Sequence, residues 1–100
     1  MIYITQLIYI KEGEEEIFHE FENVALPLLK KYSGELLLRI RPSDDALIEG
    51  TLQKPYEIHF ITFSREADLQ DFMTDEDRKQ YLHLKKKAIQ SVILVKGERM

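Results

Sequence analysis

The stretch Pro55–Ser64, PYEIHFITFS, alternates like a β-strand and decides how the rest of the chain is interpreted. Successive side chains of a strand point to opposite faces, so Glu57 and His59 share one face of this segment. Aromatic and β-branched residues fill most of its other positions, which favours a strand in the middle of a sheet. A carboxylate and an imidazole side by side on such a strand either perform chemistry or form a polar structural contact.

The segments around this strand show alternating strand and helix patterns. The residues that recur at helical spacing in the first helix are Ile17, Phe18, Phe21, Val24, Leu28 and Tyr32. Pro27 falls inside that pattern and predicts a kink or break near residues 23–26, with Leu26 off the apolar stripe, and Gly34 is the expected stop. Strands are expected at 2–10, 35–41, 55–64 and 91–96, with a short edge strand at 46–49. Ser64 and Thr74 are expected to cap the two pieces of a second helix.

The resulting order, β-α-β-β-α-β, predicts an α+β ferredoxin-like fold in a single domain covering residues 1–100. In that plan a four-stranded antiparallel sheet carries both helices on one face. The strand at 2–10 is apolar on both faces and therefore needs two covers, of which the helices supply one. We expect the helix-free face to pack on a second copy, giving a homodimer with twofold symmetry.

Composition excludes several classes of partner. The 100 residues carry a net charge of -4, and a field of that sign repels nucleic acid. The chain has no cysteine, its N-terminus lacks a basic leader pattern, and no apolar run approaches the ~20 residues that span a bilayer. We therefore expect a cytoplasmic protein with no nucleic-acid partner and no membrane segment.

The three histidines differ in their sequence surroundings. His19 and His83 lie off the apolar stripes of their helices and are expected to be solvated. His59 lies on the central strand, where we expect the partner chain to bury it on the helix-free face. Glu57 lies two residues before His59 and so on the same face, at about 7 Å, and the neighbouring strand can bring Arg39, and Arg41 beyond it, into reach.

Three interpretations of this polar group stay open. Arg39, Glu57 and His59 could bind a small polar or anionic molecule without catalysis. In the second, the protein is a cofactor-free small-molecule enzyme, an isomerase or a monooxygenase-like protein, with His59 as acid or base. In the third, Arg39 simply pairs with Glu57 and the group is structural. The sequence does not decide whether the protein is an enzyme.

Motifs for other chemistries are missing from the sequence. Two potential ligands, Glu57 and His59, do not make a metal site, and neither HxxxH nor HExxH spacing occurs. No GxSxG elbow is present, and the glycines at 13, 34, 50 and 97 are scattered singly rather than gathered into a phosphate loop. We expect neither a metal nor a cofactor.

The segments KYSGELLLRIRP, LIEG, PYEIHFITFS and SVILVKG, which fall within residues 31–97, together resemble a family of small bacterial domains of unknown function. That family belongs to the dimeric α/β-barrel superfamily, which also contains antibiotic biosynthesis monooxygenases, muconolactone isomerases and several haem proteins. The resemblance implies two ferredoxin-like sheets closing face to face into a barrel, and a cleft between sheet and helices in each chain.

The same resemblance places Arg39 where such domains tend to have an arginine near the end of the second strand, and it matches Glu49-Gly50 to their Leu-Glu-Gly turn. The chain departs from the superfamily's enzymes in two respects. It has no Trp of the kind used by the cofactor-free monooxygenases, and no histidine aligns with a haem ligand. A shared fold does not by itself establish an activity.

Overall fold

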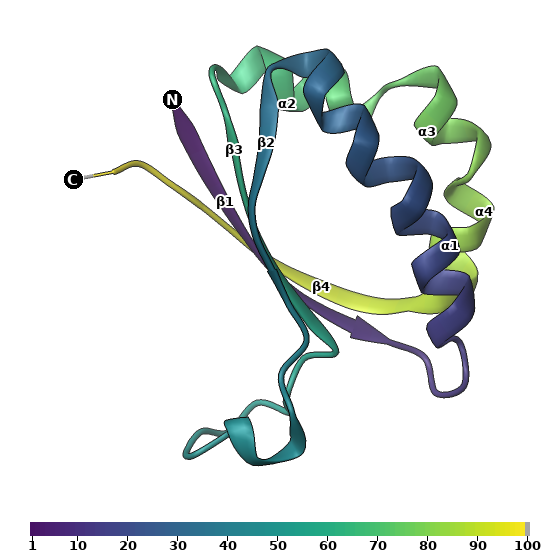
Figure 1. The fold of residues 1–100 in the computed structure, drawn as a ribbon, viewed down its shortest axis with the longest axis vertical. Coiled ribbons are helices and arrows are strands. Elements are labelled where there is room, and N and C mark those ends of the chain that lie inside the picture. The colour runs from purple at the N-terminus through teal and green to yellow at the C-terminus, as the bar shows by residue number, and fades with distance from the viewer. Residues whose placement is uncertain (100) are drawn as a thin grey trace.

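The computed structural model describes residues 1–99 and consists of one sheet with a layer of helices on one side (Figure 1). The four strands are β1 (Ile2–Ile10), β2 (Gly34–Ile40), β3 (Glu57–Phe63) and β4 (Ile89–Gly97). The α-helices are α1 (Glu15–Ala25), α2 (Glu66–Met73), α3 (Glu76–Gln80) and α4 (Leu82–Ala88), and the 3₁₀ helices are η1 (Leu26–Tyr32) and η2 (Asp44–Ala46). The predicted α+β, ferredoxin-like arrangement is confirmed.

The sheet is antiparallel throughout, with the strand order β2-β3-β1-β4. Its register places Gln6 of β1 opposite His59 of β3, and Ile8 opposite Glu57. On the other side of β1, Gln6 faces Leu94 of β4. β1 and β3 are therefore the two central strands, each paired on both sides, which fits the small number of polar residues in β1.

The first helix changes type where proline was expected to disturb it. The α-helix ends at Ala25 and a 3₁₀ helix continues to Tyr32, with Pro27 near its start. Proline has no N–H to donate, so the tighter helix begins where an α-helical hydrogen bond would be lost. The predicted break is confirmed, and Leu26 packs against the chain's own core.

Ser33, and not Gly34, adopts the left-handed conformation that ends η1, with φ at 57°. The expectation that Gly34 stops the helix was wrong in this detail. Glycine is required at position 34 for another reason: a Cβ there would lie 2.8 Å from the Phe63 ring and 3.0 Å from the Leu29 carbonyl oxygen. The first residue of β2 thus passes too close to its neighbours to carry a side chain.

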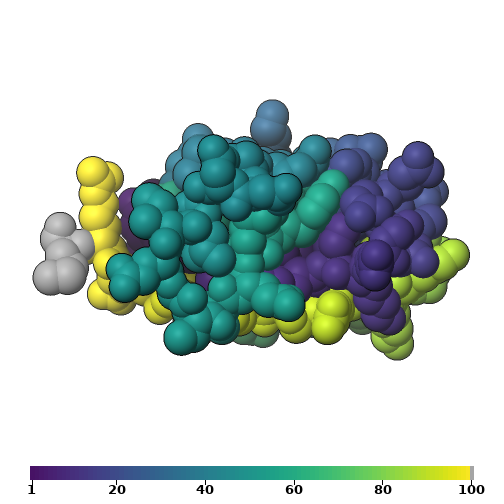
Figure 2. Space-filling view, turned by 90° about the horizontal axis from the view of Figure 1, so that it is seen from below, coloured from purple at the N-terminus to yellow at the C-terminus, as the bar shows by residue number. Residues whose placement is uncertain are grey.

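Four expectations about the connections and the second helix were wrong. Residues 46–49 form no strand, because the chain between β2 and β3 makes the short helix η2 and then a loop. This segment projects from one end of the sheet (teal in Figures 1 and 2). The second helix has three pieces instead of two. The first piece, α2, begins after Arg65 instead of Ser64. The side chain that caps α3 is that of Asp75 rather than Thr74, and it accepts a hydrogen bond from the Arg78 backbone N–H.

The face assignment of β3 is the main correction to the sequence interpretation. Glu57 and His59 point toward the helices, each about 1% exposed, instead of toward a partner on the helix-free face. On β2 a register shift at Leu37 breaks the simple alternation, so Leu36 faces the helices, whereas Leu38 pairs beside Phe60 on the open face. Since both faces of these strands are apolar, alternation alone could not tell the two sides apart.

The helix-covered side of the sheet holds two hydrophobic clusters. The larger joins the start of β1 and the end of β3 to η1 and α2, through the buried residues Ile4, Leu29, Ile61, Phe63, Leu69 and Phe72. The smaller joins Ile8 and Phe18 to Ala88 at the end of α4. Polar side chains of β3 and α1 lie on the same covered face as these clusters, and they define the candidate site.

Candidate functional site

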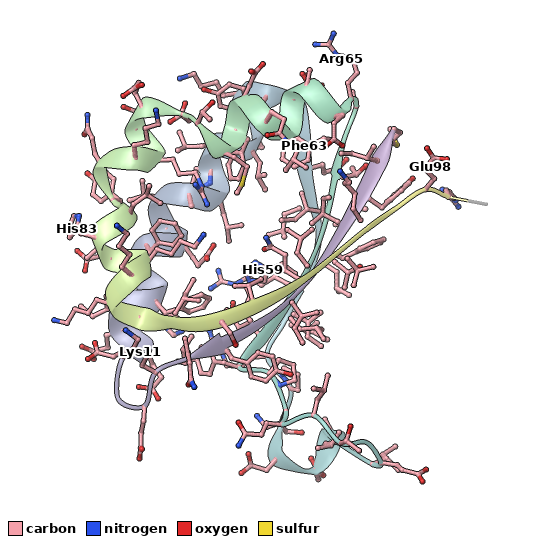
Figure 3. All side chains as sticks on the ribbon, turned by 180° about the vertical axis from the view of Figure 1, so that it is seen from behind. Lys11, His59, Phe63, Arg65, His83 and Glu98 are labelled. Carbon is pink, nitrogen blue, oxygen red and sulfur yellow. The ribbon has the colours of Figure 1, made fainter. Side chains whose placement is uncertain are left out.

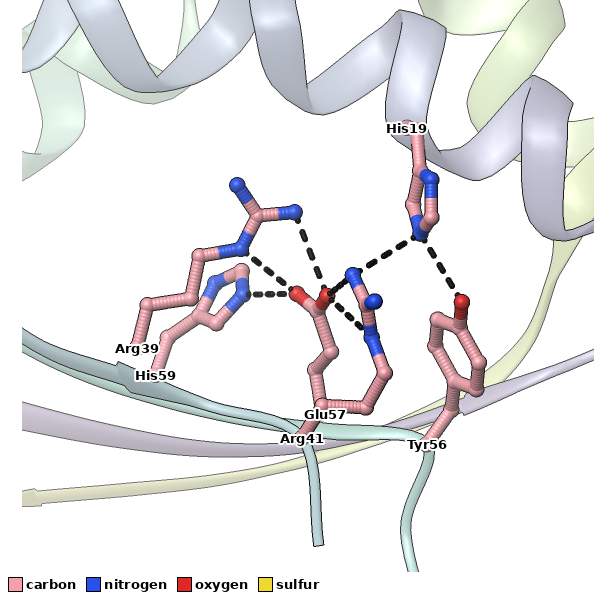
Figure 4. A network of polar contacts seen from close by, with 6 residues as sticks. All are labelled: His19, Arg39, Arg41, Tyr56, Glu57 and His59. Carbon is pink, nitrogen blue, oxygen red and sulfur yellow. Dashed lines mark hydrogen bonds and ion pairs between the residues drawn. The ribbon is translucent and has the colours of Figure 1, made fainter.

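Glu57 is the centre of a polar network between the sheet and α1 (Figure 4). Arg39 donates from Nε to Oε1 at 2.7 Å and from Nη2 to Oε2 at 3.2 Å, a two-point contact. Arg41 donates to Oε2 from Nη2 at 2.5 Å and from Nε at 3.1 Å. The Nε2 atom of His59 lies 2.8 Å from Oε1. The structure therefore brings together all three predicted residues, Arg39, Glu57 and His59, and saturates the carboxylate.

The network sets the charge of its members. Burial alone would raise the pKa of Glu57, but hydrogen bonds from Arg39, His59 and Arg41 lower it to about 2. Burial lowers the pKa of His59 below its usual 6.5, and the bond to Glu57 offsets only part of that effect. A neutral His59 donates its Nε2–H to the carboxylate, which leaves the lone pair on Nδ1 as its basic position.

His19 joins the same network, contrary to the expectation that it is solvated. Its Nε2 atom lies 2.8 Å from the Tyr56 hydroxyl and 3.0 Å from Nη2 of Arg41. Because a guanidinium can only donate, Nε2 is an acceptor, and the ring carries its proton on Nδ1. Arg41 also lies over the Tyr56 ring, 5.0 Å from its centroid. His83, by contrast, is exposed as expected (Figure 3).

A cavity of about 250 Å³ lies between the sheet and the helices. His59 faces it from β3, as the stick view shows, and Gln6 lines it from β1 (Figure 3). Arg39 and Glu57 are not among its lining residues. Of the three site residues expected from the sequence, His59 is the one with access to this space.

Three ionisable residues on the helices line the same cavity: Glu22 on α1, Arg78 on α3 and Lys85 on α4. Burial raises the pKa of Glu22 to about 7, although the positive charges of Arg39, Arg78 and Lys85 oppose the rise. Burial also lowers the pKa of Arg78 and that of Lys85. These are the ordinary signs of charged groups held away from water.

The sequence interpretation missed these three residues. None of them was singled out from the sequence as a candidate site residue. A signal for Glu22 was present, since it lies four residues after Phe18 and three before Ala25, on the apolar stripe of α1. No comparable spacing signal exists for Arg78, whose helix has only five residues.

Residues 1–99 contain no group of three or more acidic, histidine or cysteine side chains arranged to hold a metal ion. Within the same part of the chain, no helix is both long enough and apolar enough to cross a membrane.

The fold is that of small ferredoxin-like α+β proteins, and several solved structures with this fold are similar to the chain. A protein of unknown function from Rhodopseudomonas palustris superposes with a TM-score of 0.83 at 10% identity, over 99% of this chain and 82% of that one. An uncharacterised NIPSNAP domain protein from Burkholderia xenovorans gives 0.72 at 11% identity, over 100% and 95%. A dimeric ferredoxin-like protein of unknown function from Jannaschia gives 0.71 at 14% identity, over 98% of both chains.

No family model matches the sequence, and no curated protein matches it. The structural likenesses establish the fold, which the resemblance in sequence had implied, and they leave the chemistry to be argued from the residues of this chain.

Proposed function

We propose that the protein is a homodimeric binding domain that holds a small polar or anionic molecule in the cavity between its sheet and helices. The observation that supports ligand binding is the cavity itself, which combines apolar walls with a few ionisable side chains of low exposure. Such a combination is the usual composition of small-molecule sites. In this proposal His59 of β3 contacts the ligand. Arg39 and Glu57 do not line the cavity, and Glu57, held by Arg39, fixes the orientation of the His59 ring.

The dimer half of the proposal rests on the open face of the sheet. Its exposed apolar side chains include Leu38 and Ile40 on β2, and Ile93 and Val95 on β4, each between 37% and 58% exposed. A hollow of about 670 Å³ runs over this face between Leu37, Phe60 and Val95. A stable dimer needs about 800 Å² from each partner, which a four-stranded face can supply, and the Jannaschia protein is described as dimeric.

Ligand binding is tested by thermal shift against a balanced panel of small acids, amides and alcohols. At 100 times its dissociation constant a true ligand adds about 2.7 kcal/mol and raises the melting temperature by several degrees. Ala25→Leu should abolish the shift, because Ala25 lines the cavity and a larger side chain fills part of it. The proposal would be contradicted if no panel compound raised the melting temperature of wild type, or if the compounds raised the melting temperatures of wild type and Ala25→Leu equally.

A second candidate function is acid–base catalysis in the same cavity without a cofactor. The observation that favours it is a neutral His59 whose basic Nδ1 is not the atom bonded to Glu57. If a bound compound is converted, His59→Gln should reduce the rate at least about 100-fold while binding persists, as expected for loss of a general base. Mass spectrometry measures the rate of conversion. If the His59→Gln variant converts the compound at the wild-type rate, His59 has no part in the mechanism.

A further inference from the structure

The end of the cavity nearest α3 contains an unsatisfied cation. Arg78 is 7% exposed, and its Nη1 donates to the Met73 carbonyl oxygen at 3.2 Å. Its Nε is the one buried side-chain nitrogen or oxygen in residues 1–99 that has no hydrogen-bond partner. The guanidinium is held between the rings of Phe21 and Phe72, 5.8 and 5.3 Å from their centroids, so its position is fixed. A buried donor without an acceptor is costly, which points to an acceptor supplied from outside the chain.

The charges around this end do not cancel. Arg78 and Lys85 are two cations, whereas Glu22, 6% exposed, is the one carboxylate that lines the cavity with them. Among residues 1–99 no ion pair joins Glu22 to either cation. The cluster therefore has one excess positive charge when Glu22 is ionised and two when it carries a proton. A single negative charge on a ligand cancels the excess in the first state and halves it in the second, so the cluster favours an anion whether or not Glu22 carries a proton.

The groups that act on Glu22 come from four other elements. They are Arg39 on β2, Glu57 on β3, Arg78 on α3 and Lys85 on α4, and His59 of β3 lines the same cavity. Glu57 is already compensated by two guanidinium groups and His59 is neutral, so neither supplies the missing negative charge. Burial raises the pKa of Glu22 to about 7, and a second anion beside it would raise the pKa further.

The other wall of the cavity is apolar. Ile61 and Phe63 of β3 face Leu69 and Phe72 of α2 there. A space of about 250 Å³ holds a molecule of on the order of ten non-hydrogen atoms or fewer, since one water occupies about 30 Å³. The size, charge and apolar lining of the cavity therefore fit a small molecule with one charged end and an apolar body.

We infer that the cavity binds a small organic carboxylate, whose charged group contacts Arg78 and Lys85 and whose apolar body lies against β3 and α2, and that Glu22 takes up a proton when this anion binds. The inference rests on the proposed function and names its ligand class. It also makes Glu22, rather than His59, the residue through which pH controls occupancy.

The ligand class is tested by calorimetry with benzoate and hexanoate against benzamide and hexanamide, which match them in size but carry no charge. The carboxylates should bind at least about 30-fold more tightly, as expected for hydrogen bonds to charged groups. Lys85→Met should weaken carboxylate binding about tenfold and leave amide binding unchanged; this variant is used because Arg78 also packs in the core. Equal affinity for acids and amides would overturn the ligand class while leaving the binding function in place.

Proton uptake is tested by measuring benzoate affinity between pH 6 and pH 8. In wild type the affinity should fall as pH rises, by up to about tenfold, because Glu22 must be protonated in the complex. Glu22→Gln, which mimics the protonated acid, should bind at least as tightly as wild type at pH 6 and keep that affinity at pH 8. The exposed Glu20→Gln on the same helix should behave like wild type. A pH dependence that survives in Glu22→Gln would overturn the coupling.

Discussion

Glu57→Gln is expected to lower the free energy of unfolding by about 3 kcal/mol at pH 7. The carboxylate is 1% exposed and accepts hydrogen bonds from Arg39, Arg41 and His59. An amide is neutral and leaves both guanidinium groups without their counter-charge. The lowering of the Glu57 pKa from 4.5 to about 2 gives the same scale, at 1.36 kcal/mol for each pKa unit. Urea unfolding of both proteins measures the difference.

The pH dependence of this difference provides an independent check. A carboxylate whose pKa is lowered by folding contributes stability above pH 4.5, and that contribution is lost as pH falls through about 2. The gap between wild type and Glu57→Gln should therefore shrink to about 1 kcal/mol at pH 3. The exposed Glu20→Gln should match wild type at both pH values. A Glu57→Gln protein as stable as wild type at pH 7 would show that the network contributes no net stability.

Leu38→Lys is expected to convert the proposed dimer to a monomer at micromolar concentration. Leu38 is 48% exposed on the open face of β2, so the single chain tolerates a lysine there. In a twofold dimer both copies bring an unpaired charge into the interface, each at a cost of about 2 kcal/mol, which raises the dissociation constant about 1,000-fold. Light scattering across a dilution series measures the mass of the species.

Tyr81→Lys is the matched control for the dimer experiment. Tyr81 is also an exposed apolar side chain, 36% exposed, but it lies in the helix layer. The Tyr81→Lys variant should have the same mass by light scattering as the wild-type protein. A wild-type protein that is monomeric at micromolar concentration would contradict the dimer, and a Leu38→Lys protein that stays dimeric would place the interface elsewhere.

Much of the fold was predictable because periodicity reports local structure. The strand expected at 2–10 has those bounds in the structure, and the break expected before Pro27 falls at Ala25. Errors gathered where several residues compete for one role, as when Asp75 rather than Thr74 accepts the Arg78 backbone N–H and caps α3. Capping depends on backbone angles that neighbouring threonine and aspartate could equally supply.

The site was predictable only in part. The grouping of Arg39, Glu57 and His59 follows from neighbouring strands, since residues on one face of a sheet meet across the ladder. The side on which they lie does not follow, because β1 and β3 are apolar on both faces and β2 contains a bulge at Leu37. His19 was expected to be solvated, although the structure pairs it with Tyr56 and Arg41.

Periodicity in the sequence is enough to give the order of elements and to show that the sheet, apolar on both sides, needs two covers. It also identified His59 as the histidine of greatest interest. The sequence does not reveal that the Glu57 carboxylate accepts hydrogen bonds from three side chains, or that Glu22, Arg78 and Lys85 from three separate helices line one cavity with His59. The physical reason is that periodicity reports which way a side chain points from its own element. Desolvation and charge balance, by contrast, depend on what the other elements place around it.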